Sequence, residues 1–185
     1  MKPTKSTKAF AGWRTSDLAD ANEDLFMRRC LNVVAEPLKS YGGIASFHGP
    51  ISTIKCFEDT SRVHEAVRES GLGRVLFIDG GHGNSKVIFG GSLARLAAEN
   101  GWAGIIGLGF IRDVEEVRAQ GIGVYALGSI PRRSDRSKNA GERDVILKFP
   151  YATVSPGDWV YADYDGILVS STELKNVLPA GKCDL

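Results

Sequence analysis

The chain has 185 residues, 43% of them hydrophobic, so it is long enough to bury a core and fits one domain better than two. Its 23 basic and 22 acidic residues leave a net charge of +1, which excludes a whole-molecule field directed at nucleic acid or a membrane. The three cysteines lack C-x-x-C spacing, which argues against a disulfide scaffold and a structural zinc site and favours a reducing cytoplasm.

Residues 1–14 are predicted to be a flexible basic tail ahead of a single domain over residues 15–185. No apolar run of signal-peptide length follows the tail, and no stretch approaches the roughly 18 apolar residues that a membrane helix needs. Because the tail contains Arg and Ser without acidic residues, an organelle transit peptide stays open as an alternative, although the stretch is short for one.

The first elements of the domain are a helix and two strands. Ser16 is the expected N-cap of a helix that runs to about Leu31. Residues 42–57 then alternate as strands, with a break at the turn signal Gly49-Pro50. A short helix over residues 62–70 follows.

Two successive units of strand, loop and helix occupy the middle of the chain. Their predicted parts are strand 74–78, loop 79–84, helix 92–100, strand 104–108, turn 109–110 and helix 114–120. Such units favour a partly parallel sheet with ligand-facing loops at the carboxyl ends of its strands.

The last third of the chain predicts antiparallel β structure. A strand over 122–127 leads into a polar stretch, 131–143, that is expected to be an exposed loop. Short strands separated by turn signals follow, over residues 145–149, 152–154, 159–162 and 167–170. The fold class is therefore α/β, a partly parallel sheet with antiparallel C-terminal strands.

The loop from Asp79 to Gly83 is the first candidate site, because glycines after a strand let backbone amides approach a phosphate or cofactor. It loosely resembles the loop of nucleoside-methyl-donor methyltransferases, but those enzymes usually open with this unit and need further strands after it. A plain tight turn is the favoured interpretation. His82, in the same loop, has no partner at ligand spacing and is expected to be exposed or hydrogen-bonded.

The adjacent pair Arg112-Asp113 is a sharper candidate. At the end of a strand, Asp113 can bind a metal beside a guanidinium suited to bidentate carboxylate recognition. Asp113 with Glu116 also matches a capping box, and spacing alone favours that structural role.

Other polar motifs favour structural roles. Asp163-x-Asp165-Gly166 is expected to be a hairpin turn, because the downstream ligands of a calcium loop are missing. The basic stretch 132–138 has no interleaved aromatic residues, so a solvated loop is favoured over direct nucleic-acid contact. His48 and His64 are expected to be structural or on the surface.

A set of motifs along nearly the whole chain resembles the regulator of ribonuclease activity A. They are Thr15-Ser16-Asp17, Val34-Ala35-Glu36-Pro37, Lys55-Cys56-Phe57-Glu58-Asp59, Gly73-Arg74-Val75-Leu76, Leu93-Ala94-Arg95-Leu96-Ala97, Gly157-Asp158 and Tyr161-Ala162-Asp163. The chain is similar to the family that includes this regulator and the divalent-metal-dependent 4-hydroxy-4-methyl-2-oxoglutarate aldolases. The resemblance implies a swivelling β/β/α fold and homotrimers or pairs of trimers, with sites at subunit boundaries.

The aldolases of that family share a glycine-led loop followed some twenty residues later by an Arg-Asp pair. Carried over to this chain, the resemblance implies that Gly90, Gly91, Ser92 and Leu93 offer backbone amides to a substrate carboxylate. Arg112 would be the catalytic cation that binds the oxygens of pyruvate, and Asp113 would hold Mg²⁺ or Mn²⁺.

One residue departs from the aldolase pattern. The loop of those enzymes usually reads Gly-Asp-x-Leu, and this chain has Gly91 in place of the acid that orients metal-bound water and helps to protonate the enolate. A different acid would then have to serve. The C-terminal acid that longer aldolases take from a neighbouring subunit also has no obvious counterpart after Ser171.

The resemblance leaves two functions open. The first is a metal-dependent lyase that releases pyruvate from 4-hydroxy-4-methyl-2-oxoglutarate and decarboxylates oxaloacetate. The alternative is a non-enzymatic regulator that binds and inhibits an endoribonuclease of the ribonuclease E type. The retained Arg112-Asp113 pair favours the enzyme, since a protein-binding surface does not need a metal ligand.

Overall fold

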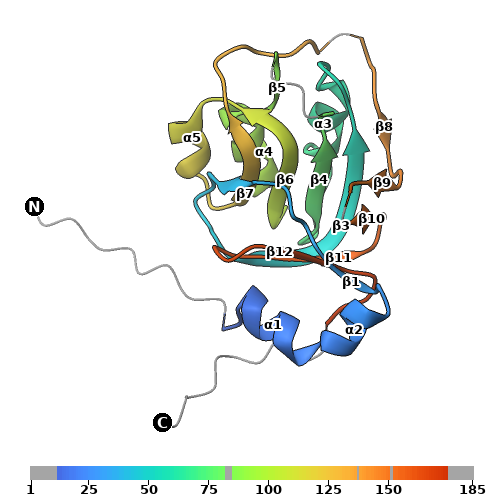
Figure 1. Cartoon of the computed structure of the whole chain (residues 1–185). Coiled ribbons are helices and arrows are strands. Elements are labelled where there is room, and N and C mark those ends of the chain that lie inside the picture. The colour runs from blue at the N-terminus through green and yellow to red at the C-terminus, as the bar shows by residue number, and fades with distance from the viewer. Residues whose placement is uncertain (1–11, 82–84, 137, 151, 175–185) are drawn as a thin grey trace, which may run out of the picture.

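A sheet of mixed direction forms the centre of the computed structural model, with helices on two sides (Figure 1). The structure describes residues 12–81, 85–136, 138–150 and 152–174. The strands lie in the order β1-β12-β11-β3-β4-β6-β7-β2, with β5 beside β6, β8 beside β3, and a separate pair of β9 and β10. The predicted α/β class is confirmed, with a parallel centre and antiparallel C-terminal strands.

The element bounds are as follows. The helices are α1 (Thr15–Ala21), α2 (Glu23–Met27), α3 (Ser61–Ala66), α4 (Gly91–Glu99) and α5 (Val114–Arg118). The strands are β1 (Leu31–Val33), β2 (Lys39–Ser40), β3 (Phe47–Lys55), β4 (Val75–Asp79), β5 (Val87–Phe89), β6 (Gly104–Ile111), β7 (Gly123–Ser129), β8 (Glu142–Arg143), β9 (Leu147–Lys148), β10 (Thr153–Val154), β11 (Trp159–Ala162) and β12 (Ile167–Ser170).

Strand β3 belongs to both halves of the sheet. Residues 47–50 pair antiparallel with β11, and from Ile51 onward the strand pairs parallel with β4. The predicted break at Gly49-Pro50 is wrong, because the strand continues through it and changes partner there. A side chain at Gly49 would press against the carbonyl of Gly73, so this position needs glycine for the close backbone approach. Pro50, which has no N–H to donate, lies at the changeover.

The parallel strands β4 and β6 are buried on both faces. Leu76 and Ile78 face helices α3 and α4, whereas Val75 and Phe77 face the antiparallel strands. Alternate side chains of a strand point to opposite faces, so a strand covered on both sides reads as a continuous apolar run. The predicted turn at 109–110 is wrong, because β6 continues to Ile111 and β5 and β7 pair with that extension.

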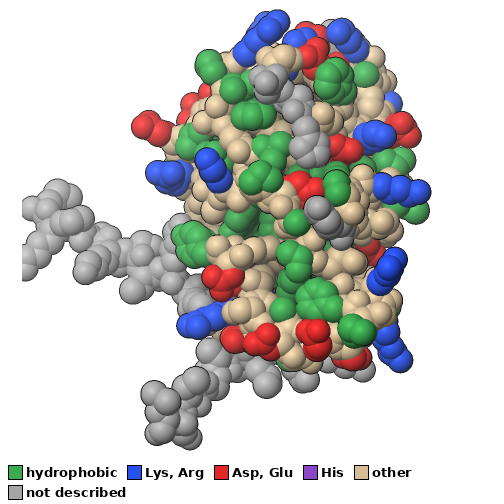
Figure 2. Space-filling model, in the orientation of Figure 1, with side chains coloured by type: hydrophobic (Ala, Val, Ile, Leu, Met, Phe, Trp, Pro, Cys, Tyr) green, Lys and Arg blue, Asp and Glu red, His purple; other side chains and the backbone are tan. Residues whose placement is uncertain are grey.

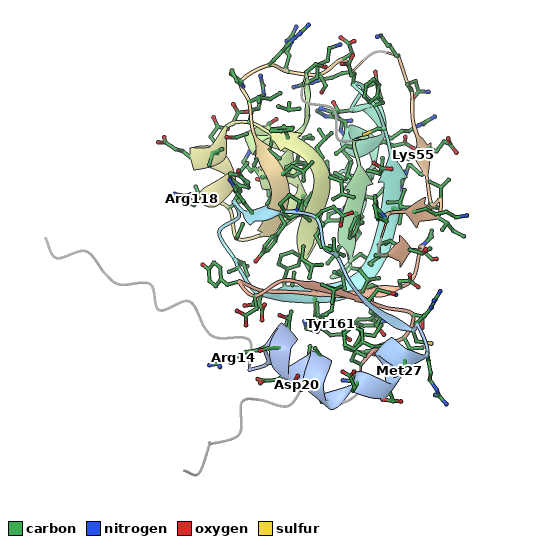
Figure 3. The ribbon with its side chains drawn as sticks, in the orientation of Figure 1. Arg14, Asp20, Met27, Lys55, Arg118 and Tyr161 are labelled. Atoms are coloured by element: carbon green, nitrogen blue, oxygen red, sulfur yellow. The ribbon has the colours of Figure 1, made fainter. Side chains whose placement is uncertain are left out.

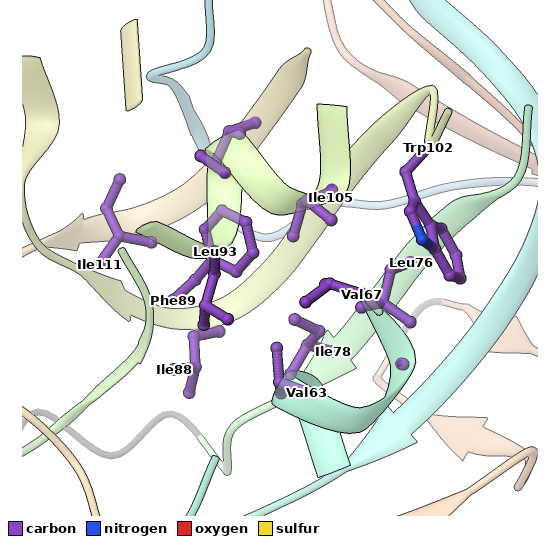
Figure 4. Packing of buried hydrophobic residues seen from close by; sticks show 14 of the residues in the cluster. Val63, Val67, Leu76, Ile78, Ile88, Phe89, Leu93, Trp102, Ile105 and Ile111 are labelled. Atoms are coloured by element: carbon purple, nitrogen blue, oxygen red, sulfur yellow. The ribbon is translucent and has the colours of Figure 1, made fainter. Parts of the chain in front are cut away.

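Three apolar clusters hold the layers together. The first packs α3 and α4 on the parallel strands, with Val63, Val67 and Leu93 meeting Leu76, Ile78 and Ile105 (Figure 4). The second lies between the parallel strands and β11 and β12, and the third packs the N-terminal helices under the antiparallel strands. The sheet is therefore covered on both sides by apolar contacts.

The N-terminal segment is two short helices rather than the single helix predicted to reach Leu31. Helix α1 ends at Ala21, and the side-chain amide of its C-cap residue Asn22 donates to the carbonyl of Leu18; α2 starts at Glu23. Asparagine competes in this way with the helical backbone bonds. The predicted N-cap is also wrong, since Arg14 occupies that position and Ser16 lies inside α1.

The aromatic contacts under β11 tie α1 to the sheet. Tyr161, labelled in Figure 3, is fully buried. Its ring stacks on His48 and packs edge-on against Trp13. The hydroxyl of Tyr161 accepts a hydrogen bond from the backbone N–H of Leu174. The prediction that His48 is structural or on the surface is confirmed by this exposed, stacked position.

The turn between β11 and β12 is the hairpin that the motif Asp163-x-Asp165-Gly166 predicts. The buried carboxylate of Asp163 accepts hydrogen bonds from the backbone N–H groups of Asp165 and Gly166 within the turn. It also accepts the N–H of Thr15 at 2.7 Å and the hydroxyl of Thr15 at 2.6 Å. One carboxylate therefore closes the hairpin and fixes the start of α1.

We expect Asp163→Ala to lower the free energy of unfolding by about 3 kcal/mol, because two buried donors of Thr15 lose their charged acceptor. Urea denaturation monitored by circular dichroism measures the change. The exposed Asp165→Ala is the matched control and should cost less than about 0.5 kcal/mol. Equal losses in the two variants would contradict the structural role assigned to Asp163.

Candidate active site

The candidate site is a pocket of about 290 Å³, including space open to solvent, beside the carboxyl ends of the parallel strands. One wall is made by the end of β5, the start of α4 and the turn after β6, with Phe89, Gly90, Ser92, Leu93, Arg112 and Asp113. A second wall is made by the start of α3 and the segment after β7, with Thr60, His64, Arg133, Ser134 and Arg136. The pocket lies at the edge of the sheet where the sequence predicts ligand-facing loops.

The Arg112-Asp113 turn links β6 to α5. Asp113 adopts the left-handed conformation, with φ 56° and ψ 45°, and occupies the N-cap position of α5. Its side chain makes no capping hydrogen bond, so the capping-box interpretation with Glu116 is wrong. Its Oδ2 instead lies 3.2 Å from Nε of Arg112, and the two side chains are 35% and 30% exposed. The turn therefore presents a carboxylate and a guanidinium together at the pocket.

The backbone at Gly90 allows the pair to approach the first turn of α4. Gly90 is extended and is the N-cap residue of α4. A Cβ atom at this position would lie 3.1 Å from Oδ2 of Asp113 and 3.2 Å from Cγ of Arg112. The first N–H groups of a helix have no partner inside it, and they attract negative charge. The start of α4 and Arg112 thus converge on one place suited to a carboxylate.

Gly91 lies against Glu116 of the neighbouring helix. A Cβ atom at position 91 would be 2.6 Å from Cβ of Glu116 and would overlap its carboxylate oxygen Oε2. The space that a side chain at position 91 would need is therefore occupied by Glu116. The departure from the Gly-Asp-x-Leu pattern is matched here by a carboxylate that reaches the same place from α5.

The segment after β7 is better ordered than the predicted exposed loop. Ser134 is buried and its hydroxyl lies 3.1 Å from that of Thr60. The backbone N–H of Thr60 donates to the carbonyl of Asp135, and residues 142–143 form strand β8 on the edge of β3. The prediction for residues 131–143 is therefore only partly right, because exposed side chains stand on an anchored backbone.

His64 is part of the pocket, whereas the sequence suggested only a structural or surface role. Burial lowers the pKa of its imidazole, and the nearby guanidinium groups of Arg136 and Arg68 lower the pKa further. The neutral imidazole is therefore favoured, and it can donate or accept a hydrogen bond without adding charge.

The glycines after β4 have packing roles. A Cβ atom at Gly80 would lie 2.6 Å from Cγ2 of Ile88. Gly81 has a positive φ of 67°, and its backbone N–H donates to the carboxylate of Asp79 within the turn. These observations support the tight-turn interpretation over a cofactor cradle. His82 and Gly83 lie outside the described residues.

Most of the site residues implied by the family resemblance meet at this pocket. Gly90, Ser92, Leu93, Arg112 and Asp113 line it, and Gly91 lies beside it under Glu116. Sequence reasoning missed Arg133, Arg136, Thr60, His64 and Glu116. The only available signal was the density of arginine in residues 132–136, which composition alone cannot distinguish from a solvated loop.

Asp113 fits an open cation site rather than a closed one. Among the described residues, no three His, Cys, Asp or Glu side chains come together as a ligand set. Mg²⁺ commonly binds through one or two carboxylates and keeps several waters, so a partly exposed carboxylate at a pocket suits it. A structural zinc site, which needs four protein ligands, does not fit.

Residues 15–169 match the family model described as RraA-like, Aldolase/RraA. The chain belongs to this family. A provisionally named 4-hydroxy-4-methyl-2-oxoglutarate aldolase of Burkholderia multivorans is 47% identical over 160 residues, covering 86% of this chain and 97% of that protein. A relative of the same name from Cupriavidus necator is 44% identical over 162 residues, covering 88% of this chain and 98% of its own.

Two solved structures share the fold over nearly their whole length. One, described as an S-adenosylmethionine:2-dimethylmenaquinone methyltransferase of Geobacillus kaustophilus, is 41% identical with a TM-score of 0.82, covering 89% of this chain and 99% of its own. The other, described as the RNA-processing inhibitor RraA of Thermus thermophilis, is 38% identical with a TM-score of 0.82, covering 91% and 99%. Relatives of this RraA-like protein thus carry three different functional names.

The left-handed conformation of Asp113 predicts opposite effects for two substitutions that both remove its ion pair. Asp113→Gly should raise the free energy of unfolding by about 0.5–1 kcal/mol, because glycine adopts this conformation without strain. Asp113→Ala should lower it by about 1 kcal/mol, since the methyl group is disfavoured there. Chemical denaturation of both variants checks the prediction, and an alanine variant as stable as the glycine variant would contradict it.

Proposed function

We propose that this RraA-like protein is a divalent-metal-dependent lyase that releases pyruvate from 4-hydroxy-4-methyl-2-oxoglutarate and also decarboxylates oxaloacetate. The observation that carries the proposal is the meeting of Arg112, Asp113 and the start of α4 in one pocket. The aldolase names of its relatives support a lyase. None of the helices in the described segments has the length and apolar character to cross a membrane.

The substrate carboxylate next to the 2-oxo group is placed by Arg112 and by the first amides of α4. A guanidinium binds a carboxylate through two parallel hydrogen bonds, and the helix N-terminus adds partial positive charge. Asp113 would hold Mg²⁺ or Mn²⁺, which supplies Lewis-acid polarisation of the 2-oxo oxygen when bound. Arg112 also stabilises the negative charge that develops as the carbon–carbon bond breaks.

Cleavage breaks the C3–C4 bond of the substrate. The bonding electron pair stays on C3 in the enolate of pyruvate, while the C4 hydroxyl loses its proton and becomes the carbonyl of the second product. The enolate then takes a proton at C3. With oxaloacetate, CO₂ leaves in place of the second carbonyl product, and no hydroxyl proton has to be removed.

Glu116 is the carboxylate that we propose for proton transfer. It lies one turn along α5 from Asp113 and fills the space beside Gly91 at the start of α4. A Schiff-base route through Lys86 is disfavoured, because hydrogen bonding to Asp135 raises the pKa of this lysine and keeps it protonated.

The first experiment is pyruvate release from both substrates, coupled to lactate dehydrogenase, with Mg²⁺ and with EDTA. We expect metal-dependent release in the wild type and a loss of at least about 100-fold in Asp113→Asn. Binding of Mn²⁺ in the presence of pyruvate, followed by electron paramagnetic resonance, gives a readout that does not depend on turnover. Full activity in a folded Asp113→Asn protein would refute the metal assignment.

The contact between Gly91 and Glu116 predicts a coupled effect on the aldol reaction. Gly91→Asp alone should gain little, because its Cβ atom meets Cβ of Glu116. Glu116→Gly should lower the aldol rate by about 10- to 100-fold. The double variant Gly91→Asp/Glu116→Gly should recover much of that loss, because glycine at position 116 removes the Cβ atom that blocks position 91 and the acid returns from the other side of the contact. Failure of the double variant to exceed Glu116→Gly would argue against this exchange.

A regulatory function is the second candidate, favoured by the 38% identity to the structure described as an RNA-processing inhibitor. In that case the chain would bind the C-terminal scaffold of an endoribonuclease of the ribonuclease E type. A pull-down at micromolar concentration, with wild type and Asp113→Asn in parallel, separates the two functions. Binding that survives the substitution, in a protein without lyase activity, would favour the regulator.

We further propose a homotrimer or a pair of trimers in the cytoplasm, with sites at subunit boundaries. Large apolar side chains that a partner subunit would cover are exposed on the single chain, among them Phe57 at 63% and Ile146 at 58%. Sedimentation equilibrium of the full chain measures the assembly, and a monomer at micromolar concentration would contradict it.

A further inference from the structure

The far wall of the pocket carries two arginines for which the reaction described above has no use. Arg133 and Arg136 line the same pocket as Arg112 and the start of α4. They come from the segment that joins β7 to β8. Basic side chains gather over this edge of the molecule, with acidic ones between them, at the top of Figure 2.

Hydrogen bonds hold the backbone that carries these arginines. Asp135 donates its N–H to the carbonyl of Glu58, and the N–H of Thr60 donates to the carbonyl of Asp135 at 3.0 Å. The backbone N–H of Lys138 donates to the carboxylate of Asp59. The segment is therefore pinned to the start of α3, so the two guanidinium groups project from a fixed position rather than from a loose loop.

The cations on and beside this segment divide into two groups. Lys86 lies 3.0 Å from the carboxylate of Asp135 and 3.5 Å from that of Glu58, and Lys138 lies 3.0 Å from Asp135, so two carboxylates balance the two lysines. Arg133 and Arg136, by contrast, form no ion pair with any carboxylate of the described residues. Two exposed cations without carboxylate partners in the described segments, side by side at one pocket, raise the local positive potential and so attract an anion.

We propose that Arg133 and Arg136 form a second anion subsite that takes the distal carboxylate of a 2-oxo dicarboxylic acid. This inference rests on the proposed function, which places the first carboxylate on Arg112. Guanidinium groups suit carboxylates because both are planar and can form paired hydrogen bonds. The subsite would make the pocket select 2-oxo diacids over 2-oxo monoacids, and neutral His64 beside it adds a hydrogen bond without repelling either partner.

Calorimetry with uncleaved ligands tests the subsite in the full chain with Mg²⁺ present. The ligands are 2-oxoglutarate, which has two carboxylates, and 2-oxobutyrate, which has one. We expect the wild type to bind 2-oxoglutarate at least 10-fold more tightly. Arg133→Ala/Arg136→Ala should remove that preference and leave the affinity for 2-oxobutyrate within 2-fold. Arg132→Ala, on the same segment but outside the pocket lining, is the matched control and should keep the preference.

The outcomes separate this inference from the proposed function. Binding of both ligands with equal affinity in the wild type, or an unchanged preference in the double variant, would overturn the subsite and leave the lyase intact. Binding of neither ligand would overturn the lyase and the subsite together. Inorganic phosphate that binds more tightly than 2-oxoglutarate at the same arginines would overturn the carboxylate assignment.

Discussion

Hydrogen bonding along β3 joins the two halves of the sheet. The strand pairs with β11 on one stretch and with β4 on the next, so the antiparallel hairpin and the parallel strands share one backbone. The register of β4 and β6 follows from that of β3, and the ends of those strands set the position of Arg112 and Asp113. The site thus depends on a strand that contributes none of the pocket's side chains.

Close backbone approach shapes the catalytic wall. Gly90 and Gly91 begin α4, and each glycine makes room for a side chain from the segment around α5. The first accommodates Arg112 and Asp113, and the second accommodates Glu116. Because Gly91 has no side chain, position 91 carries no acid, and the carboxylate of Glu116 occupies the space that a side chain there would fill. The chain therefore lacks the motif's acid at position 91 but still has a carboxylate, that of Glu116, beside the same place.

In the second wall of the pocket, a polar segment that would otherwise be a solvated loop is held in place by backbone hydrogen bonds. Residues 131–138 have the composition of a solvated loop, yet Ser134 is buried and the backbone bonds to the start of α3. An anchored cation costs less conformational entropy to bring to a ligand than a mobile one does. Arginines on such a backbone are suited to selecting a ligand, whereas the same residues on a loose loop would mainly aid solubility.

The sequence by itself determined the α/β class, the buried parallel strands, the hairpin at Asp163 and, through family resemblance, the pairing of the glycine loop with Arg112-Asp113. These features depend on apolar periodicity and short-range turn chemistry, which are local. Tertiary structure alone decided that β3 runs through Gly49-Pro50, that Asp113 does not cap its helix, and that Glu116 fills the place beside Gly91. It also brought Arg133 and Arg136 to the pocket. Apart from the ion pair of Asp113 with its neighbour Arg112, these results depend on contacts between residues distant in the chain, which local patterns do not encode.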